Sequence, residues 1–293
     1  MDFPNIAIVT VSYNSSSQLD AFLSSVRETC GRSPRVIVAD NASRDVATTR
    51  EIARRFHSDV HPLPANVGYG QAINAVVADL PESFEAVLIA NPDLSLALHA
   101  LEILVARLTS EPDAGAVGPR ILNADGSTYP SARAVPSLWG GAMHAGLHRI
   151  WPRNPWSTRY RLDSPEHVTL RDVGWLSGAC VLVRRAAFDA IGGFDPAFFM
   201  YFEDVDLGMR LGLAGWRNIY DPSAVVTHIG GESTKSESSA MIRAHHASAT
   251  TFVSRQHPHW YQWPVRAMVR AGLGVRQAIA LRRARRATSA RAD

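Results

Sequence analysis

The chain has 293 residues, of which 46% are hydrophobic, so it is neither disordered nor fibrous in character. Its 30 basic and 27 acidic residues give a formal charge of +3. From Pro264 to the end, however, eight arginines stand against one acid. The chain therefore has a mildly acidic body and a basic C-terminal appendage.

The N-terminus has no basic leader, and its apolar run is too short for a signal peptide or a membrane span. We therefore expect a cytoplasmic protein. Cys30 and Cys180 lack metal-ligand spacing, and in a reducing compartment we expect them to be buried thiols.

The first part of the chain alternates apolar, β-branched runs with segments of helical periodicity. The pattern predicts strands at 5–12, 35–39, 60–63 and 86–90, and helices around 19–26, 52–56, 73–80 and 98–108. Strictly alternating units of this length favour a parallel sheet with right-handed crossovers. The predicted fold class is therefore α/β, with a Rossmann-like, mostly parallel central sheet flanked by helices.

After residue 114 the pattern changes. Strands are predicted at 116–122, 173–184 and 216–228, with a long segment of little periodicity at 127–156 that is rich in Pro, Trp, His and Arg. Helices are predicted at 236–255 and 264–286, and in the second one apolar residues and arginines interleave as in a basic amphipathic helix.

Polar residues follow several of the predicted strands, where α/β sheets bind their ligands. They are Thr10, Ser12, Asp40, Asn41, Ser43, Asn66 and Asp93. A Gly-x-Gly-x-x-Gly fingerprint is absent because no correctly spaced third glycine follows Gly70, and no Walker-type Gly-Lys-Ser occurs. The sequence thus indicates a ligand site at the strand ends and excludes a P-loop protein.

In the stretch 198–211, five bulky apolar residues run directly into Glu203, Asp204 and Asp206 at the start of a helical pattern. Carboxylates beside an aromatic wall can be partly desolvated and can accept protons. Acidic residues also cap helix N-termini and complement the helix dipole. From this stretch alone, structural capping and catalysis are both open.

A nucleotide-diphosphate leaving group needs base recognition, charge neutralisation and an activated acceptor. Asp40 could accept the N3–H of uracil or thymine, and Asp93 could ligate a hard divalent cation. His228 could add an imidazole to the same metal, and Asp204 is the candidate proton acceptor. Asp40 and Asp93 could instead be cap or turn residues, and His228 a hydrogen-bonded strand-end histidine.

The motifs together resemble the family 2 inverting glycosyltransferases of the GT-A fold over nearly the whole chain and in the same order. They are Val-Thr-Val-Ser-Tyr-Asn (9–14), Val-Ala-Asp-Asn-Ala-Ser (38–43), Asn-Val-Gly-Tyr-Gly-Gln-Ala-Ile-Asn (66–74), Asn-Pro-Asp (91–93), Gly-Trp-Leu-Ser-Gly-Ala-Cys (174–180) and the segment 192–207. More narrowly, 126–133, 141–144 and 151–156 resemble the actinobacterial rhamnosyltransferases that build the linker between peptidoglycan and galactan.

This resemblance implies transfer of L-rhamnose from dTDP-β-L-rhamnose to the 3-hydroxyl of N-acetylglucosamine on a polyprenyl diphosphate. It implies that the donor nucleotide is bound by Thr10, Ser12, Asp40, Asn66 and Asn91, a divalent cation (Mn²⁺ or Mg²⁺) by Asp93 and His228, and the acceptor by Trp175, Ser177, Gly178, Glu203 and Asp206. Asp204 would be the base. In one departure, Asn91 stands where the family's Asp-x-Asp motif has its first acid, which leaves the strength of metal dependence open.

We expect one GT-A domain over 1–257, with a nucleotide-sugar half (1–112) and an acceptor half (113–257), and a basic helical extension over 258–293. The extension could be a solvated helix, but a lipid-linked acceptor favours peripheral attachment to the inner face of the plasma membrane. Nucleic-acid binding is weaker because no recognition motif accompanies the arginines. Rival functions are a family 2 enzyme using UDP-galactofuranose or another rhamnosyl acceptor, and a non-catalytic nucleotide-sugar-binding scaffold.

Overall fold

The computed structural model describes residues 5–30, 34–136, 168–229 and 239–289, with side chains to Arg282. The first half contains β1 (Ile6–Ser12), α1 (Ser16–Thr29), β2 (Arg35–Asp40), α2 (Val46–Arg55), β3 (Asp59–Pro62), α3 (Tyr69–Ala78), β4 (Ala86–Ala90), β5 (Leu94–Leu96) and α4 (Ala100–Ser110). The second half contains β6 (Ala114–Asn123), β7 (Thr128–Tyr129), β8 (Ala132–Arg133), β9 (Arg171–Val173), β10 (Trp175–Leu176), β11 (Cys180–Arg184), α7 (Arg185–Ala190), α8 (Glu203–Leu213) and β12 (Arg217–His228). A C-terminal pair of helices, α9 (Ser239–Gln256) and α10 (Trp263–Ser289), is joined through the 3₁₀ turn η1 (Trp260–Gln262).

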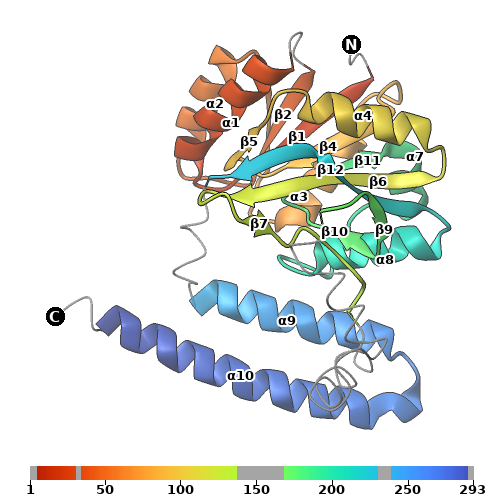
Figure 1. Ribbon diagram of the computed structural model, residues 1–293. Coiled ribbons are helices and arrows are strands. Elements are labelled where there is room, and N and C mark those ends of the chain that lie inside the picture. The colour runs from red at the N-terminus through yellow and green to blue at the C-terminus, as the bar shows by residue number, and fades with distance from the viewer. Residues whose placement is uncertain (1–4, 31–33, 137–167, 230–238, 290–293) are drawn as a thin grey trace.

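The central sheet has the order β3-β2-β1-β4-β11-β6-β12-β5 (Figure 1). Strands β1 to β4 are mutually parallel, as the alternating pattern predicts, and β6 and β12 are also parallel. Strand β11 runs antiparallel to both β4 and β6. The sheet is therefore mostly parallel, and β11 joins its two parallel parts.

Both faces of the sheet are buried under helices, and successive side chains of a strand point to opposite faces. In β1, Ile6 and Ile8 pack with α1 and α4, whereas Ala7, Val9 and Val11 pack with α3 and α8. This explains the continuous apolar runs of the central strands. Cys30 and Cys180 are buried free thiols, as expected, and burial raises the pKa of Cys180 to about 12.

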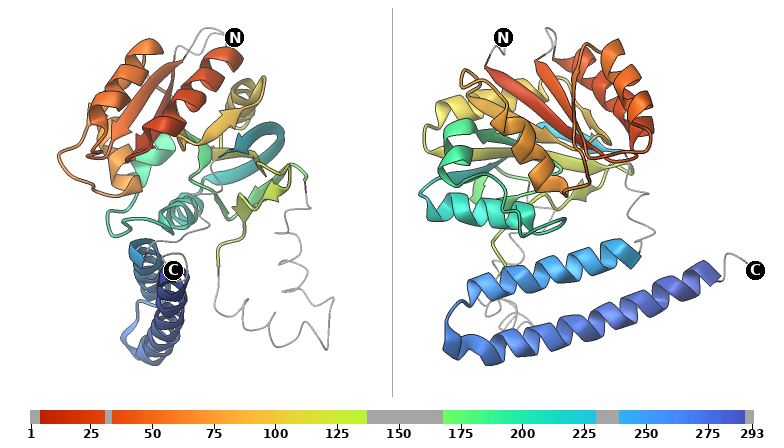
Figure 2. Two further views of the ribbon diagram at one scale, coloured as in Figure 1. Left: turned by 90° about the vertical axis from the view of Figure 1, so that its left-hand side faces the viewer. Right: turned by 180° about the vertical axis from the view of Figure 1, so that it is seen from behind.

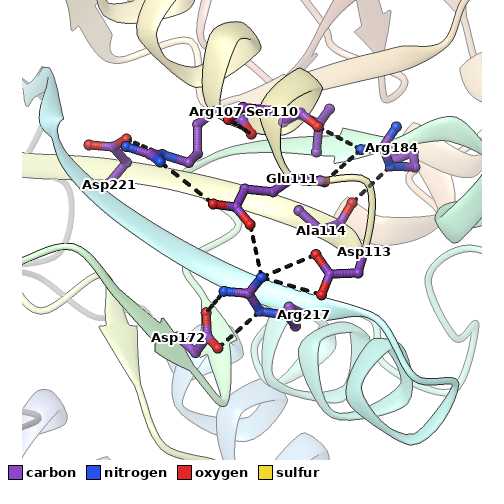
Figure 3. Close-up of polar contacts among 10 residues, drawn as sticks. Arg107, Ser110, Glu111, Asp113, Ala114, Asp172, Arg184, Arg217 and Asp221 are labelled. Carbon is purple, nitrogen blue, oxygen red and sulfur yellow. Dashed lines mark hydrogen bonds and ion pairs between the residues drawn. The ribbon is translucent and has the colours of Figure 1, made fainter.

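An ion-pair network fastens the sheet at the edge where its parallel strands begin. Arg217, at the start of β12, donates to Asp172, Asp113 and Glu111 at 2.8–3.1 Å (Figure 3). Beside it, the guanidinium of Arg184 donates to three carbonyl oxygens at the end of α4 and the start of β6. These contacts tie α4, β6, β9, β11 and β12 together far along the sheet from the strand ends that carry the predicted site.

Two predictions of local structure were wrong. The apolar stretch 173–184 forms three strands instead of one, interrupted at Gly174 and at Ser177–Ala179. A Cβ on Gly174 would lie 2.3 Å from the backbone nitrogen of Val135, so this close approach requires glycine. Helix α4 begins at Ala100, which leaves Leu98 outside it and exposed.

Helices α9 and α10 lie side by side as a hairpin on the side of the body that carries α8 (Figures 1 and 2). Phe252 of α9 packs with Phe198 and Val205 to form a small third hydrophobic cluster. Within the described ranges, no helix is long and apolar enough to cross a membrane.

The domain boundaries stay predictions. The boundary at 112/113 falls between α4 and β6, and the two halves share one sheet. The boundary at 257/258 falls just after α9, within the hairpin. The predicted motifs at 141–144 and 151–156 lie outside the described residues.

Candidate active site

The end of β1 and the end of β2 place two unpaired polar atoms in the interior. Asp40 is 1% exposed; its Oδ1 accepts the Ser43 backbone N–H at 2.9 Å, while its Oδ2 has no protein partner. The Oγ1 of fully buried Thr10 is also without a partner. Because buried polar atoms are nearly always hydrogen-bonded, these two are available to a ligand.

The other predicted nucleotide residues shape the loops around this point. The Oγ of Ser12 lies 3.0 Å from that of Ser15, and the Ser12 carbonyl accepts the backbone N–H of Asn41. Asn41 donates from Nδ2 to the Oδ1 of Asn66 at 2.9 Å, and its own Oδ1 accepts the Val67 N–H. Asn41, one of the polar residues that follow the predicted strands, thus holds the loop that carries Asn66.

Asp93 and His228 lie together, as predicted. The Oδ1 of Asp93 is 3.0 Å from Nε2 of His228, and both side chains are 14% exposed. The pair is held by β5 and β12, which run antiparallel with His228 opposite Leu94, and by the Ile229 N–H, which the Asp93 carbonyl accepts at 2.8 Å. Asn91 directly follows β4, and its backbone N–H donates to the carbonyl of Ala179.

The Asp93–His228 pair fits a divalent cation. A carboxylate oxygen and an imidazole nitrogen are ligands suited to manganese, and two adjacent ligands of one octahedral ion lie about 3 Å apart. Substrate phosphates and water usually complete such a site. No group of three or more His, Cys, Asp or Glu gathers among the residues described, and Asp93 and His228 are the two candidate ligands that they bring together here.

The carboxylates Glu203 and Asp204 open α8, after two residues in the left-handed region, Tyr201 at φ 67° and Phe202 at φ 65°. Asp204 accepts the Gly178 N–H at 3.1 Å on Oδ2 and the Val205 N–H at 2.8 Å on Oδ1. Its side chain therefore faces the Ser177–Ala179 turn, which interrupts the predicted strand. That interruption is what brings Gly178 to the carboxylate.

The environment raises the pKa of both carboxyls. For Glu203, burial and then the nearby charge of Asp204 raise the pKa from 4.5 to about 8. For Asp204, burial raises the pKa, while backbone hydrogen bonds from Gly178 and Val205 lower it. The Oε2 of Glu203 is buried without a partner. At neutral pH the Glu203 carboxyl therefore keeps its proton, and Asp204 keeps its two N–H donors.

The predicted acceptor residues divide into two groups. Ser177 and Gly178 lie in the turn beside Asp204, and Trp175 precedes it; the indole N–H of Trp175 donates to the Ala134 carbonyl at 3.1 Å. Asp206 lies elsewhere, because residues two apart on a helix occupy different faces. It is 1% exposed and forms a 2.6 Å ion pair with Arg210.

Two residues that sequence reasoning missed take part in this arrangement. The hydroxyl of Tyr69 donates to the Gly178 carbonyl at 2.7 Å, and burial, together with the charges of Glu203 and Asp204, raises the pKa of Tyr69 well above its ordinary value. Tyr69 stands within the motif 66–74, so its position was visible. Arg255 of α9 lies 3.7 Å from Asp206 and pairs with Asp195, and no motif marks it.

Comparison with known proteins gives this geometry a family. The profile described as "Glycosyltransferase like family 2" matches residues 4–261. The chain belongs to glycosyltransferase family 2. It is 42% identical, over 96% of its length and 95% of the relative's, to the N-acetylglucosaminyl-diphospho-decaprenol L-rhamnosyltransferase of Mycobacterium tuberculosis. The protein is thus a glycosyltransferase, and the predicted resemblance is confirmed.

Solved structures confirm the GT-A fold of this glycosyltransferase. GalNAc-T7 with UDP, GalNAc and Mn²⁺ superposes with a TM-score of 0.57 at 17% identity, covering 77% of this chain and 43% of that one. S. aureus TarS residues 1–349 superposes with a TM-score of 0.53 at 17% identity, covering 83% and 65%. At this identity the likeness is one of fold alone.

Proposed function

We propose that this glycosyltransferase moves L-rhamnose from dTDP-β-L-rhamnose to the 3-hydroxyl of a polyprenyl-diphosphate-linked N-acetylglucosamine, with inversion at the anomeric carbon. The observation that carries the proposal is the 42% identity to the mycobacterial rhamnosyltransferase, which spans both chains almost end to end. The geometry of the strand ends and of α8 supplies a role for each group.

On the donor side, the unpaired Oδ2 of Asp40 is a buried acceptor for the N3–H of thymine, which cytosine lacks. The unpaired Oγ1 of Thr10 can donate or accept beside it. Asp93 and His228 would hold the divalent cation, which when bound neutralises the diphosphate of the leaving nucleotide. Asn91 supplies no charge here, so the protein relies on one carboxylate at this point.

On the acceptor side, Asp204 takes the proton from the attacking sugar hydroxyl. The Gly178 and Val205 N–H groups orient its two oxygens, and Glu203 stays protonated beside it, so that only one negative charge occupies the pair. Trp175, Ser177 and Gly178 would line the acceptor sugar. Tyr69 fixes the turn by its bond to the Gly178 carbonyl.

The lipid-linked acceptor gives the basic C-terminal region a function. The enzyme meets this substrate at a membrane surface, and each arginine close to an anionic surface adds roughly 1 kcal/mol of attraction. Peripheral attachment to the inner face of the plasma membrane is the corresponding proposal for where the enzyme acts.

A donor screen tests the function. Purified enzyme is incubated with a short-chain, water-soluble polyprenyl-diphosphate N-acetylglucosamine and each of dTDP-rhamnose, UDP-galactofuranose and UDP-galactose, with and without Mn²⁺ or Mg²⁺. Transfer from dTDP-rhamnose alone, giving an α-linked product by NMR, is the expected result. Transfer only from a UDP-sugar would replace the donor, and binding without any transfer would favour the scaffold.

A further inference from the structure

The C-terminal hairpin has an unusual charge. Between residues 239 and 289, which include both helices and their connecting turn, the sequence has nine arginines and no aspartate or glutamate. Arg270, Arg276 and Arg282 of α10 are exposed. A surface of this sign fits an anionic partner, and it disfavours a second copy of the same hairpin because two such surfaces repel each other.

The same hairpin exposes large apolar side chains. Six of the thirteen large apolar side chains that are exposed in the described part of the chain lie between residues 260 and 279. Trp260, Tyr261 and Trp263 at the turn are 82%, 59% and 61% exposed, and Met268, Val275 and Ile279 continue along α10. Exposed apolar groups gathered in one place mark an interaction surface.

Helical spacing places Met268, Val275 and Ile279 on one stripe of α10. Val265, Val269 and Leu273 are half-buried and fall on another side of the helix. The sequence predicted one apolar face and one basic face. In the structure, one apolar row of α10 is half-buried and a second row is exposed.

The turn that carries the aromatic residues is internally braced. Arg266 donates from Nη1 to the carbonyl oxygens of His257 at 2.6 Å and His259 at 2.9 Å. The His259 N–H donates to Gln262, and the His259 ring stacks on Tyr261 with centroids 5.3 Å apart. The aromatic side chains are therefore held in an exposed arrangement at little further cost in conformational entropy, as in a preformed binding surface.

We propose that the aromatic turn and the uncovered row of α10 form a docking surface for an anionic lipid bilayer. Tryptophan and tyrosine prefer the headgroup region, where an apolar ring and a polar N–H or O–H are both satisfied. The exposed row of α10 enters the acyl boundary beside them, and Arg276 and Arg282, which flank this row on the helix, meet lipid phosphates. A nucleic-acid partner would use the arginines but leave the aliphatic row in water.

This surface deepens the proposed function and rests on it for the reason to approach a membrane. Phe252 packs α9 onto Phe198 and Val205, at the start of the helix that carries the candidate base. The hairpin and α8 lie on the same side of the body (Figures 1 and 2). Docking through the hairpin therefore brings the acceptor side of the enzyme close to the bilayer that holds the lipid-linked sugar.

The test is co-sedimentation of the full-length enzyme with vesicles of phosphatidylcholine, with and without phosphatidylglycerol. We expect wild type to bind the anionic vesicles, and the double substitution Trp260→Ser and Trp263→Ser to weaken binding at least roughly tenfold. The matched control, Leu98→Ser with Leu213→Ser, changes two equally exposed apolar residues on the body and should bind as wild type does. Replacing Arg276 and Arg282 by glutamine should weaken binding to anionic vesicles only.

The outcomes separate this proposal from the proposed function. Activity on the short-chain, water-soluble acceptor needs no vesicle. If wild type shows no such activity, the proposed function is contradicted, whereas the vesicle measurement still tests the lipid-binding surface. Equal vesicle binding by the tryptophan double variant and wild type would overturn the lipid surface. So would sedimentation velocity showing that wild type self-associates and that the double variant is a monomer.

Discussion

The buried carboxyl of Glu203 gives a prediction that needs no substrate. Its pKa is about 8 in the folded protein, against 4.5 for an exposed glutamate, because burial and the charge of Asp204 both penalise its ionised form. Replacing Glu203 with glutamine keeps the shape and neutrality of the protonated carboxyl but removes the titration. The substitution should therefore change how the free energy of unfolding depends on pH.

The direction of this pH dependence follows from which state of the chain, folded or unfolded, binds the proton. Below about pH 4.5, the folded and unfolded chains both hold the proton, so the free energy of unfolding loses nothing to the ionisation of Glu203. Between about 4.5 and 8 the unfolded chain has lost the proton and the folded chain keeps it, so wild type loses about 1.4 kcal/mol of stability per pH unit. Over that span the ceiling is about 5 kcal/mol, and Asp204, whose pKa is also raised, acts in the same direction.

The assay is urea unfolding of wild type and the Glu203→Gln variant at several pH values from 5 to 9. All other titrating groups are common to both proteins, so the difference between the curves reports Glu203 together with its electrostatic coupling to Asp204. We expect the variant to gain stability relative to wild type as pH rises, by several kcal/mol at most. A Glu82→Gln variant, changed at an exposed position, should run parallel to wild type. Parallel curves for Glu203→Gln would refute the buried, protonated carboxyl.

Three further predictions concern catalysis and the fold. Asp204→Asn should lower kcat by roughly 10²–10⁴ in stopped-time assays. Its unfolding midpoint, followed by circular dichroism, should change by no more than that of the Glu203 variant. Retained turnover would rule out Asp204 as the base. Asp93→Ala and His228→Ala should each weaken Mn²⁺ binding in the presence of dTDP by roughly tenfold or more, read by calorimetry, and unchanged affinity would move the metal elsewhere. Gly68→Ala should destabilise the protein by about 2 kcal/mol or more in urea unfolding, because φ is +89° and the new Cβ would lie 2.2 Å from a neighbouring carbonyl oxygen. Gly212→Ala, in a helix with open space around it, should instead be neutral or slightly stabilising.

The first half of the fold could be predicted from sequence because its pattern is local. Each buried strand of the parallel part is a continuous apolar run, and the apolar spacing of each helix follows directly. The second half was harder. The stretch 173–184 is apolar enough to be one strand. It is interrupted at Gly174 by the close approach of Val135 and at Gly178 by the hydrogen bond to Asp204, and both partners are distant in sequence. Such contacts leave no periodic signal.

The candidate site shows the same division. Asp40, Asp93 and His228 were found because they follow apolar runs, and the fold then brings strand ends to one edge of the sheet. Tyr69 acts through a hydrogen bond to the backbone carbonyl of Gly178; the motif 66–74 marks its position, but nothing in the sequence predicts that contact. Asp206 looked equivalent to its neighbours at 203 and 204, but in the structure it forms an ion pair with Arg210.

The segment 199–202, which leads into α8, connects the candidate base Asp204 to elements far from any motif. Tyr201 and Phe202 both adopt left-handed backbone conformations, which cost of order 1 kcal/mol each in residues with side chains. Such a conformation persists only where its surroundings hold it. The carbonyl of Phe199 accepts the N–H of Tyr69 at the start of α3, and Ser248 of α9 donates to the carbonyl of Met200 at 2.8 Å. The segment that delivers the two carboxylates is thus held between the nucleotide half and the C-terminal hairpin, so the hairpin helps to set the geometry of the candidate base as well as carrying the proposed lipid surface.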